Sequence, residues 1–418
     1  MQPAPPPPAE CEDEDSPPAG PRSPSWLRPS GLGTSAAALP TVEIPAPAPV
    51  PAASPVSAVG GAAEIEGCTG IAPPTARIWR VPGSGAALSD PTAYAERPWG
   101  DGTAPPLYCP RTERVDDLLA DEVDERLVRW AGKCGASPAE LDALRKVRFG
   151  RLVMLAHADV DDPDALLVAA QMNTAWWAAD DYYADSTEAG ADPAMLPQRL
   201  VLAMAALDPL PPAGDLSTEL DEALRDDLVL RMLDSAVEHM GLHGSPTQVQ
   251  RACYATFSMF VSWDAYAAWR QVGTFPPAWL YLAARQHDSF YTSMVLIDAV
   301  GGYELPAALF YDPRVRRALI QAGTASVIVN DLFSVAKDAA DGVCNLVSLI
   351  AADRGCSVAE ATGIAVGLHN DYVHEFEAAH RELATVPSPE LQRFLRGVRA
   401  WMGGGFEWHA TNPRYSGA

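Results

Sequence analysis

The chain has 418 residues, enough for one large domain or two ordinary ones, and a formal net charge of −24. This acidity argues against nonspecific binding to nucleic acid or to an anionic membrane, because both need a basic surface. Seven scattered cysteines without a Cys-x-x-Cys pair argue against a zinc site and predict reduced thiols. With no signal peptide pattern and no uninterrupted apolar run of about 18 residues, we expect a cytoplasmic, soluble protein with no membrane span.

The N-terminal part differs sharply in composition from the rest. The first 110 residues contain 24 of the 39 prolines, beginning with the run Pro5 to Pro8. A segment so poor in large apolar residues cannot offset the entropy lost on ordering. We therefore expect a disordered Pro/Ala-rich arm over residues 1–110 and a single folded domain over residues 111–418.

The second part of the chain has the apolar spacing of helices. From Val115 to Trp130, apolar residues recur every three or four positions with acids and arginines between them. Ser137 before Pro138 is an N-cap and first-turn pair. The sequence shows no strand-like alternation, so the predicted fold is all-α. The further helices are expected at 138–156, 163–184, 195–207, 217–241, 246–270, 277–298, 306–310, 313–336, 343–352, 357–384 and 388–409.

The first group of candidate functional residues ends an apolar helix that contains Trp176 and Trp177. It consists of Asp180, Asp181 and Asp185, of which the last two are four residues apart and so share a helical face. Like charges this close repel each other unless a cation or a basic partner lies between them. An acidic helix end in an acid-rich protein is the alternative interpretation.

The second group is a polar stripe on an apolar helix. Asn330, Ser334 and Asp338 follow one another at intervals of four and line up within about 80° of one face. Amide, hydroxyl and carboxylate oxygens are hard donors of the kind Mg²⁺ prefers. The surrounding residues are apolar, which favours a cavity inside a core over an ordinary solvated stripe.

The third feature is the pair Arg414-Tyr415 near the C-terminus. In this order and spacing, the three features resemble the class I terpene synthases over about residues 115–418. The resemblance implies a helical bundle around a central cavity. It also implies three Mg²⁺ ions that join an allylic diphosphate to Asp180, Asp181 and Asp185 on one side and to Asn330, Ser334 and Asp338 on the other. Such enzymes are often homodimers.

The same resemblance assigns roles to several further residues. Arg285 matches a diphosphate-sensing arginine about 45 residues before Asn330, and Asp288 matches the residue that links the sensor to a helix break. Arg285 and Arg414 are expected to clamp the diphosphate, since guanidinium groups suit phosphate oxygens. Lys337 is expected to add a point charge.

Two departures from the family pattern concern metal ligands. The family commonly places its third acid where Ala184 stands, so Asp185 is one position late. Asp338 replaces a glutamate that is one methylene longer.

Within the family, the resemblance is strongest to the 2-methylisoborneol synthases. The arm, the first motif and the C-terminal segment from Thr411 to Gly417 are similar. This implies that 2-methylgeranyl diphosphate and water give 2-methylisoborneol and diphosphate. The diphosphate leaves, and aromatic faces in a dry cavity stabilise the carbocation. The aromatic candidates are Trp176, Trp177, Phe257, Trp263, Trp269, Trp401, Phe406 and Trp408.

Several alternatives remain open from the sequence. Another cyclase of the monoterpene or methylated monoterpene type, such as one forming 2-methylenebornane, or a sesquiterpene cyclase would carry the same motifs. A prenyl-chain elongase would normally carry a second Asp-rich motif after residue 300, where none is found. A ferritin-like di-iron protein needs two Glu-x-x-His pairs, and only Glu377 to His380 supplies one. A noncatalytic helical scaffold would leave the polar stripe and Arg414-Tyr415 without a role.

Overall fold

The computed structural model describes residues 93–185, 191–412 and 415. These residues belong to one compact unit that spans Val81–Ala418. Most of the expected arm, as well as Arg414 and the side chain of Asp185, lies outside the described residues.

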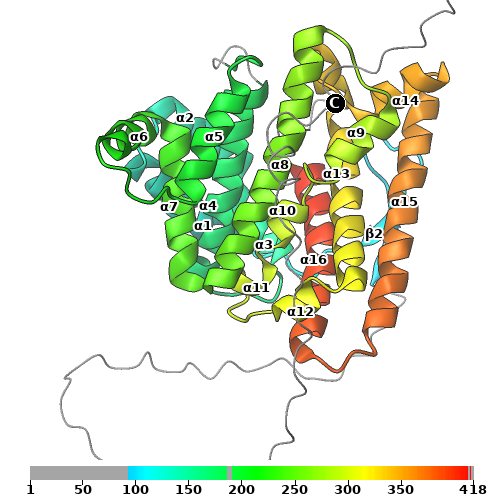
Figure 1. Cartoon of the computed structure of the whole chain (residues 1–418). Coiled ribbons are helices and arrows are strands. Elements are labelled where there is room, and N and C mark those ends of the chain that lie inside the picture. The colour runs from blue at the N-terminus through cyan, green and yellow to red at the C-terminus, as the bar shows by residue number, and fades with distance from the viewer. Residues whose placement is uncertain (1–92, 186–190, 413–414, 416–418) are drawn as a thin grey trace, which may run out of the picture. The chain divides into compact units, whose positions relative to one another are not determined.

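Helices dominate the described part of the chain, which confirms the all-α prediction (Figure 1). The helices are α1 (Asp117–Lys133), α2 (Pro138–Val147), α3 (Phe149–Ala156), α4 (Pro163–Ala179), the π-helical turn η3 (Asp180–Asp185), α5 (Leu196–Leu207), α6 (Asp215–Asp226), α7 (Leu228–His243), α8 (Pro246–Val272), α9 (Ala278–Arg285), α10 (Tyr291–Met294), α11 (Ile297–Val300), α12 (Ala307–Phe310), α13 (Pro313–Asp341), α14 (Leu346–Arg354), α15 (Val358–Leu383) and α16 (Pro389–Thr411).

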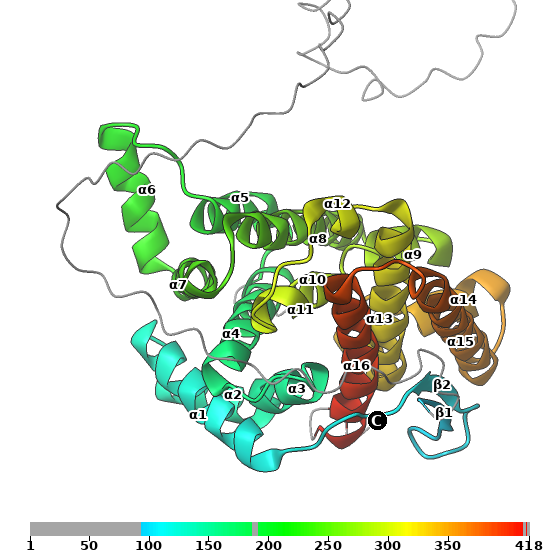
Figure 2. The ribbon, with the colours of Figure 1, turned by 90° about the horizontal axis from the view of Figure 1, so that it is seen from below.

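The long helices form a closed circuit, seen end-on in Figure 2. Helix α4 packs against α3 and α7, α3 packs against α16, and α16 packs against α13. Helix α8 completes the circuit through contacts with α5, α7, α9 and α10. Helices α14 and α15 cover the outer side of α13. The inner faces of α4, α8 and α13 therefore point toward the same interior region.

Three expected helices are interrupted, each at an identifiable place. The range 138–156 breaks at Arg148, whose backbone is left-handed with φ 61°. The range 217–241 breaks at Asp227, whose carboxylate caps α7 by accepting from the amide of Val229. The range 277–298 breaks between α9 and α10. Residues 286–290 therefore leave the helical path, and their backbone and side chains can take positions that a continuous helix would not allow.

Glycines allow two close contacts between elements of the circuit. A Cβ on Gly323 of α13 would lie 2.7 Å from the backbone nitrogen of Tyr291. A Cβ on Gly404 of α16 would lie 2.4 Å from the carbonyl oxygen of Leu155. The first contact seats the break after α9 directly against α13, and it thereby brings Arg285 close to Asn330.

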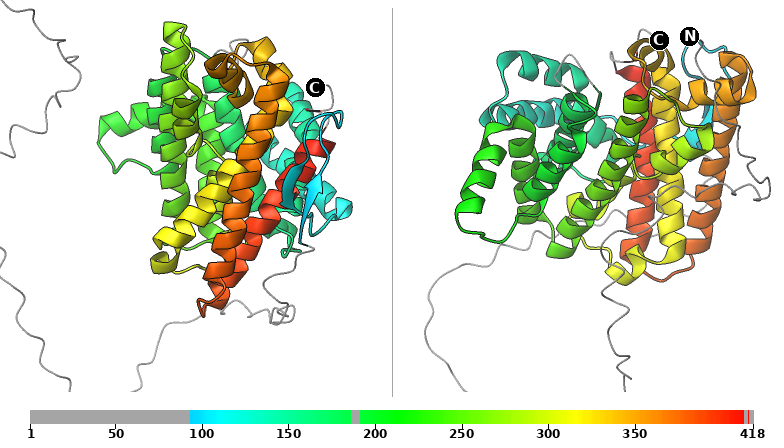
Figure 3. Two further views of the ribbon diagram at one scale, coloured as in Figure 1. Left: turned by 90° about the vertical axis from the view of Figure 1, so that its right-hand side faces the viewer. Right: turned by 45° about the horizontal axis from the view of Figure 1, so that its top comes forward.

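A two-stranded hairpin precedes the helices, and its four-residue strands are too short to show a periodic pattern in the sequence. Strands β1 (Tyr94–Arg97) and β2 (Leu107–Pro110) pair antiparallel and lie along α15 and α16 (Figure 3). The amide of Tyr108 donates to Asn370 Oδ1 at 2.8 Å, and Arg97 Nη2 lies 2.5 Å from Glu407 Oε2. Residues 93–110, which precede the expected domain start at residue 111, thus pack against the helical body.

Helix α13 has the length and mean hydropathy of a membrane-spanning helix. Counting uninterrupted apolar residues does not reveal it, because polar residues interrupt the run. Of its most apolar 18-residue window, 83% is buried inside the protein. Its apolar character is therefore that of a helix at the centre of a folded core.

A pair of N-terminal deletions tests where the folded domain begins. Removing residues 1–92 should leave stability and activity near those of the full chain, because the proline-rich composition of this segment cannot build a core. Removing residues 1–104 also deletes β1 and the Arg97–Glu407 pair, and we expect a loss of about 2 kcal/mol, or roughly 2–4 °C in Tm for a domain of this size. Thermal unfolding of both forms provides the measurement. Equal melting temperatures would show that the hairpin is dispensable.

Candidate active site

A cavity of about 320 Å³ lies at the centre of the circuit. Its lining comes from α4, α8, α9, α10 and α13, from the loops 273–275 and 342–344, from the break between α9 and α10, and from Tyr415. Most of the residues predicted from the sequence line it. Those are Trp176, Trp177, Asp180, Arg285, Asp288, Asn330, Ser334, Lys337, Asp338 and Tyr415.

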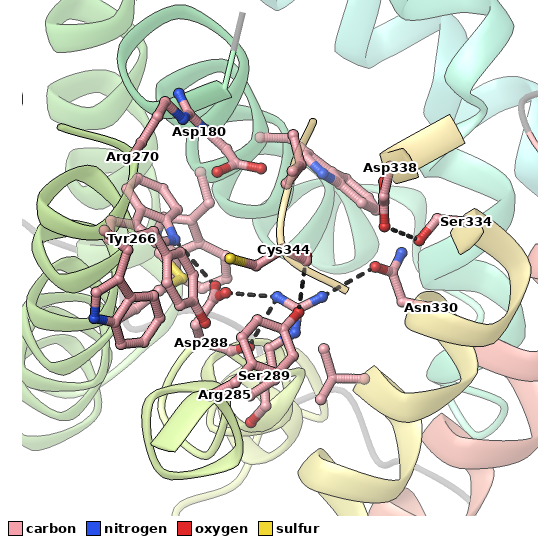
Figure 4. A pocket seen from close by; sticks show the side chains of 18 of the residues that line it. Asp180, Tyr266, Arg270, Arg285, Asp288, Ser289, Asn330, Ser334, Asp338 and Cys344 are labelled. Carbon is pink, nitrogen blue, oxygen red and sulfur yellow. Dashed lines mark hydrogen bonds and ion pairs between the residues drawn. The ribbon is translucent and has the colours of Figure 1, made fainter. Parts of the chain in front are cut away.

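The polar stripe of α13 faces this cavity, as the four-residue spacing predicts (Figure 4). Ser334 Oγ donates to Asp338 Oδ2 at 2.5 Å, and Asn330 Oδ1 accepts from Arg285 Nη2 at 3.2 Å. Among the described residues, no three Asp, Glu, His or Cys side chains gather as a metal site. The oxygen donors that do gather are an amide, a hydroxyl and a carboxylate, and this donor set fits Mg²⁺.

Asn330 is held in one amide orientation by two residues near the C-terminus. His409 Nδ1 lies 2.7 Å from the carbonyl oxygen of Gly405, which can only accept, so His409 Nε2 is left as an acceptor. Asn330 Nδ2 donates to His409 Nε2 at 3.2 Å and to the hydroxyl of Tyr415 at 3.1 Å. The amide oxygen, which is the predicted metal-binding atom, is thereby turned away from His409 and Tyr415.

Asn345 holds the other end of the stripe. It caps α14 by accepting from the amide of Val347 through Oδ1, and this directs its Nδ2 back toward α13. There Nδ2 donates to Asp338 Oδ2 at 2.8 Å and lies 3.4 Å from Ser334 Oγ. The shorter side chain of Asp338 is thus fixed next to Ser334 by a buried amide.

The acids after α4 do not all face the same space. Asp180 lines the cavity and approaches it from α4, whereas Asn330 approaches from α13 (Figure 4). Asp181 lines a second hollow between α1, α2, α4 and α7, where Tyr182 donates to Glu140 at 2.8 Å. The π-helical hydrogen bonding of η3 takes more residues per turn than the α-helix assumed from the sequence.

Arg285, whose side chain is 15% exposed, is the centre of an ion cluster at the polar end of the cavity. Its Nη1 lies 2.5 Å from Asp288 Oδ2, and its Nη2 lies 2.7 Å from Asp331 Oδ1. Burial opposes the charge of the guanidinium, but the carboxylates of Asp331 and Asp288 raise the pKa of Arg285 well above its ordinary value. Burial raises the pKa of Asp331, and Arg285 opposes that rise. The cluster joins α9 to α13.

Aromatic and polar neighbours fix this cluster. The indole of Trp263 donates to Asp288 Oδ1 at 3.0 Å, and the hydroxyl of Tyr281 lies 3.3 Å from both oxygens of Asp331. Lys337 is at the rim, where it pairs with Asp341 at 3.0 Å and is about half exposed. A guanidinium and an ammonium group therefore flank the oxygen donors of α13, as an anionic ligand requires.

Aromatic rings cover much of the remaining cavity wall. Of the candidates from the sequence, Trp176, Trp177, Trp263 and Trp269 line it, whereas Phe257, Trp401, Phe406 and Trp408 do not. The sequence analysis missed four further aromatic residues of the lining, which are Tyr266, Phe275, Tyr281 and Phe290. A wall of this kind can stabilise a cation through the faces of its rings.

A thiol lines the cavity and is held in its neutral form. Burial raises the pKa of the Cys344 thiol to about 11, although Arg270 opposes the rise. The thiolate is the nucleophilic form of cysteine, and it is scarce at neutral pH for a thiol with this pKa. A reactive electrophile inside the cavity therefore meets a neutral thiol.

Sequence reasoning gave no role to several residues that hold the site together. Asp331 lies inside the polar motif, and Tyr281 precedes Arg285 by one helical turn, so position alone could have drawn attention to both. Asn345 carries the signature of a helix N-cap. His409 had no comparable signal, because its contact with Asn330 is with a residue 79 positions away. Trp263 is one of the predicted aromatic candidates, but the sequence does not indicate its hydrogen bond to Asp288, 25 positions away.

Comparison with known proteins gives a consistent result. A family model described as terpene synthase family 2, C-terminal metal binding, matches residues 171–375. The 2-methylisoborneol synthase of Streptomyces coelicolor is 35% identical over 84% of this chain and 79% of its own length. That of Streptomyces griseus is 33% identical over 98% of this chain and 92% of its own length.

A crystal structure of the Streptomyces coelicolor enzyme in complex with Mg²⁺ and 2-fluoroneryl diphosphate has a similar fold. Its TM-score is 0.70 at 34% sequence identity, over 74% of this chain and 96% of that one.

Neutralising Asp331 tests the ion cluster independently of any ligand. We expect Asp331→Asn to lower the free energy of unfolding by about 2–3 kcal/mol, because it removes the buried one of the two carboxylates that face Arg285. The control is Asp341→Asn, which breaks a half-exposed pair with Lys337 and should cost less than about 1 kcal/mol. Urea unfolding measures both. Equal losses would mean that the Arg285 cluster contributes no more than a surface pair.

Proposed function

Because this chain belongs to the terpene synthase family and is a magnesium-dependent terpene cyclase, we propose that it converts 2-methylgeranyl diphosphate and water into 2-methylisoborneol and diphosphate. The observation that carries the proposal is the similarity to 2-methylisoborneol synthases over most of both chains. Because the chain belongs to this family, nothing supports the two alternative interpretations, a prenyl-chain elongase and a noncatalytic helical scaffold. A different terpene product remains the competing possibility.

The residues of α4 and α13 have complementary roles in this proposal. Asp180, Asp181 and Asp185 hold metal on one side, and Asn330, Ser334 and Asp338 hold it on the other, with three Mg²⁺ ions in all. Bound Mg²⁺ acts as a Lewis acid that takes up the negative charge of the leaving diphosphate. The position of Asp180 in the cavity lining supports its part, whereas Asp181 would have to turn from the second hollow.

The basic residues bind and orient the diphosphate. Arg285 exchanges part of its ion pairing with Asp331 and Asp288 for phosphate oxygens, and Lys337 adds charge at the rim. Arg414 and the hydroxyl of Tyr415 complete the clamp. Trp176, Trp177 and Trp263 then face the cation with ring surfaces that carry no reactive nucleophile.

The size of the cavity supports a short hydrocarbon chain. About 320 Å³ lies at the low end of the range for small-molecule pockets, and the wall is formed by large rings. Bulk water must be kept from the newly formed cation, and the large rings of the wall leave little space for it.

We also propose a homodimer and a cytoplasmic location. Helices α5 and α8 pack against each other and present exposed apolar side chains that include Val201, Tyr254 and Val261. Exposed apolar side chains gathered in this way are typical of contact surfaces. All five cysteines of the described residues are free thiols, as in a reducing compartment. A monomeric mass by light scattering would exclude the dimer.

Removing one hydroxyl tests the metal assignment. We expect Ser334→Ala to raise the Mg²⁺ concentration needed for half-maximal turnover and to lower kcat about 100-fold, since each 1.36 kcal/mol of barrier is a factor of ten. Ser326→Ala is the matched control, because Ser326 is a buried serine on the same helix that does not line the cavity. Near-native turnover of Ser334→Ala at limiting Mg²⁺ would contradict the assignment.

Competition among three substrates tests the proposed product. We expect 2-methylgeranyl diphosphate to be preferred, and geranyl diphosphate to react roughly 10- to 100-fold less efficiently, because one methyl in an apolar niche gives this discrimination. Farnesyl diphosphate should overfill the cavity and turn over slowly. Gas chromatography with mass spectrometry identifies the products. A preference for farnesyl diphosphate would identify a sesquiterpene cyclase, and a hydrocarbon as sole product from 2-methylgeranyl diphosphate would identify a 2-methylenebornane-type cyclase.

A further inference from the structure

Three polar side chains line the cavity away from its ionic end. Asn173 is on α4, and Thr292 and Ser293 are on α10. Asn173 precedes Asp180 by seven residues, which places it on nearly the same helical face and about 10 Å further along the axis. All three side chains are at least nine-tenths buried, with exposed fractions of 6%, 1% and 5%.

These side chains have hydrogen-bonding capacity that the protein does not use. Ser293 Oγ donates to Asn173 Oδ1 at 2.7 Å. Asn173 Nδ2 donates one of its two protons to the carbonyl oxygen of Ala169 at 2.8 Å. Asn173 Nδ2 has a second proton, and Ser293 Oγ has a further acceptor site. The hydroxyl of Thr292 is buried and has no hydrogen-bond partner among the described residues.

A buried hydroxyl without a partner is destabilising, and in native proteins it usually marks a place where water or a ligand binds. A buried water molecule typically makes about three hydrogen bonds to such groups. Asn173 Nδ2 and the Thr292 hydroxyl can donate to a water oxygen, while Ser293 Oγ can accept from it. The three groups thus supply the number and kinds of partners that one water molecule needs.

We propose that Asn173, Thr292 and Ser293 bind the water molecule that captures the cyclised carbocation. The inference rests on the proposed function, because only an alcohol product takes its oxygen from water. A lone pair of the water oxygen forms the carbon–oxygen bond, and the resulting oxonium ion loses one proton to solvent water, while the diphosphate ion is the product released in the first step. Substrate and water are thereby converted into alcohol and diphosphate with no oxidant or reductant.

The chemistry of the three groups suits this task. An amide and two hydroxyls are uncharged, so they hold water without turning it into hydroxide. A carbocation is electrophilic enough to react with neutral water, and no general base is needed to activate it. A carboxylate or an imidazole in the same place would itself attack the cation or remove a proton from it.

The position of the three groups also explains how early capture is avoided. Ionisation takes place between Asp180 and the stripe of α13, at the polar end of the cavity. Water held about 10 Å along α4 from Asp180 cannot reach the allylic carbon that has just lost diphosphate. This water can reach the positive charge only after cyclisation has moved that charge to a carbon of the ring system. The spacing therefore favours a cyclic alcohol over a linear one.

The test is the ratio of alcohol to hydrocarbon formed from 2-methylgeranyl diphosphate in H₂¹⁸O, with diphosphate release measured separately. Thr292→Val preserves shape and removes the hydroxyl, and Asn173→Leu removes the amide. We expect the ¹⁸O-labelled alcohol fraction to fall roughly five-fold or more in each, while alkenes formed by proton loss increase. Diphosphate release should fall by a smaller factor, because ionisation occurs at the other end of the cavity.

Two further variants separate water binding from a structural role. Thr292→Ser restores a hydroxyl and should recover the alcohol fraction. Thr174→Val removes a buried hydroxyl from the next position on α4, where Thr174 lines the second hollow, and should leave the product ratio unchanged.

Each remaining outcome has one meaning. A wild-type alcohol fraction in Thr292→Val and Asn173→Leu, with labelled alcohol formed by the wild-type protein, would overturn the water site and leave the proposed function intact. A wild-type protein that forms no labelled alcohol would overturn the proposed function itself.

Discussion

The buried charge of Arg285 is the constraint on which the rest of the site depends. A guanidinium at this depth is stable only with carboxylates around it, and Asp288 and Asp331 come from two different segments of the chain. Satisfying Arg285 therefore fixes the break after α9 against α13. That contact requires Gly323, where any side chain would collide with the backbone of Tyr291. Once the two segments are joined, the oxygen donors of α13 must face the same cavity as Arg285.

The cavity consequently has two chemically different ends. Charged groups gather where α9 meets α13, close to the Cys344 thiol, and Asp180 and Arg270 add charge from the side of α4 and α8. Much of the remaining wall consists of rings. Asn173, Thr292 and Ser293 add uncharged polar groups to the lining. This gradient is already built into α4 and its continuation into η3, since Asn173 and Asp180 lie on nearly one helical face. One helix thereby supplies both ends of the cavity.

The sequence predicts those parts of the molecule that depend on spacing along one helix. The interval of four residues placed Asn330, Ser334 and Asp338 on one face, and the structure has them lining one cavity. Spacing could not reveal that Asp181 faces a second hollow, because η3 departs from the α-helical period. It could not find His409 either, since its contact with Asn330 exists only after α16 has packed against α13. The hairpin before α1 escaped notice because four-residue strands carry too little periodicity.

The apolar character of α13 has a consequence for how the chain is made. Synthesis proceeds from the N-terminus, so α13 leaves the ribosome before α14, α15 and α16, which later cover it. During that interval an 18-residue window as apolar as a membrane span has no tertiary partner on those sides. Exposed apolar surface in incomplete chains is prone to aggregation, and chaperones act on such surface. A chain that stops before α14 would lack its covering helices altogether, so the segment after α13 serves solubility as much as catalysis.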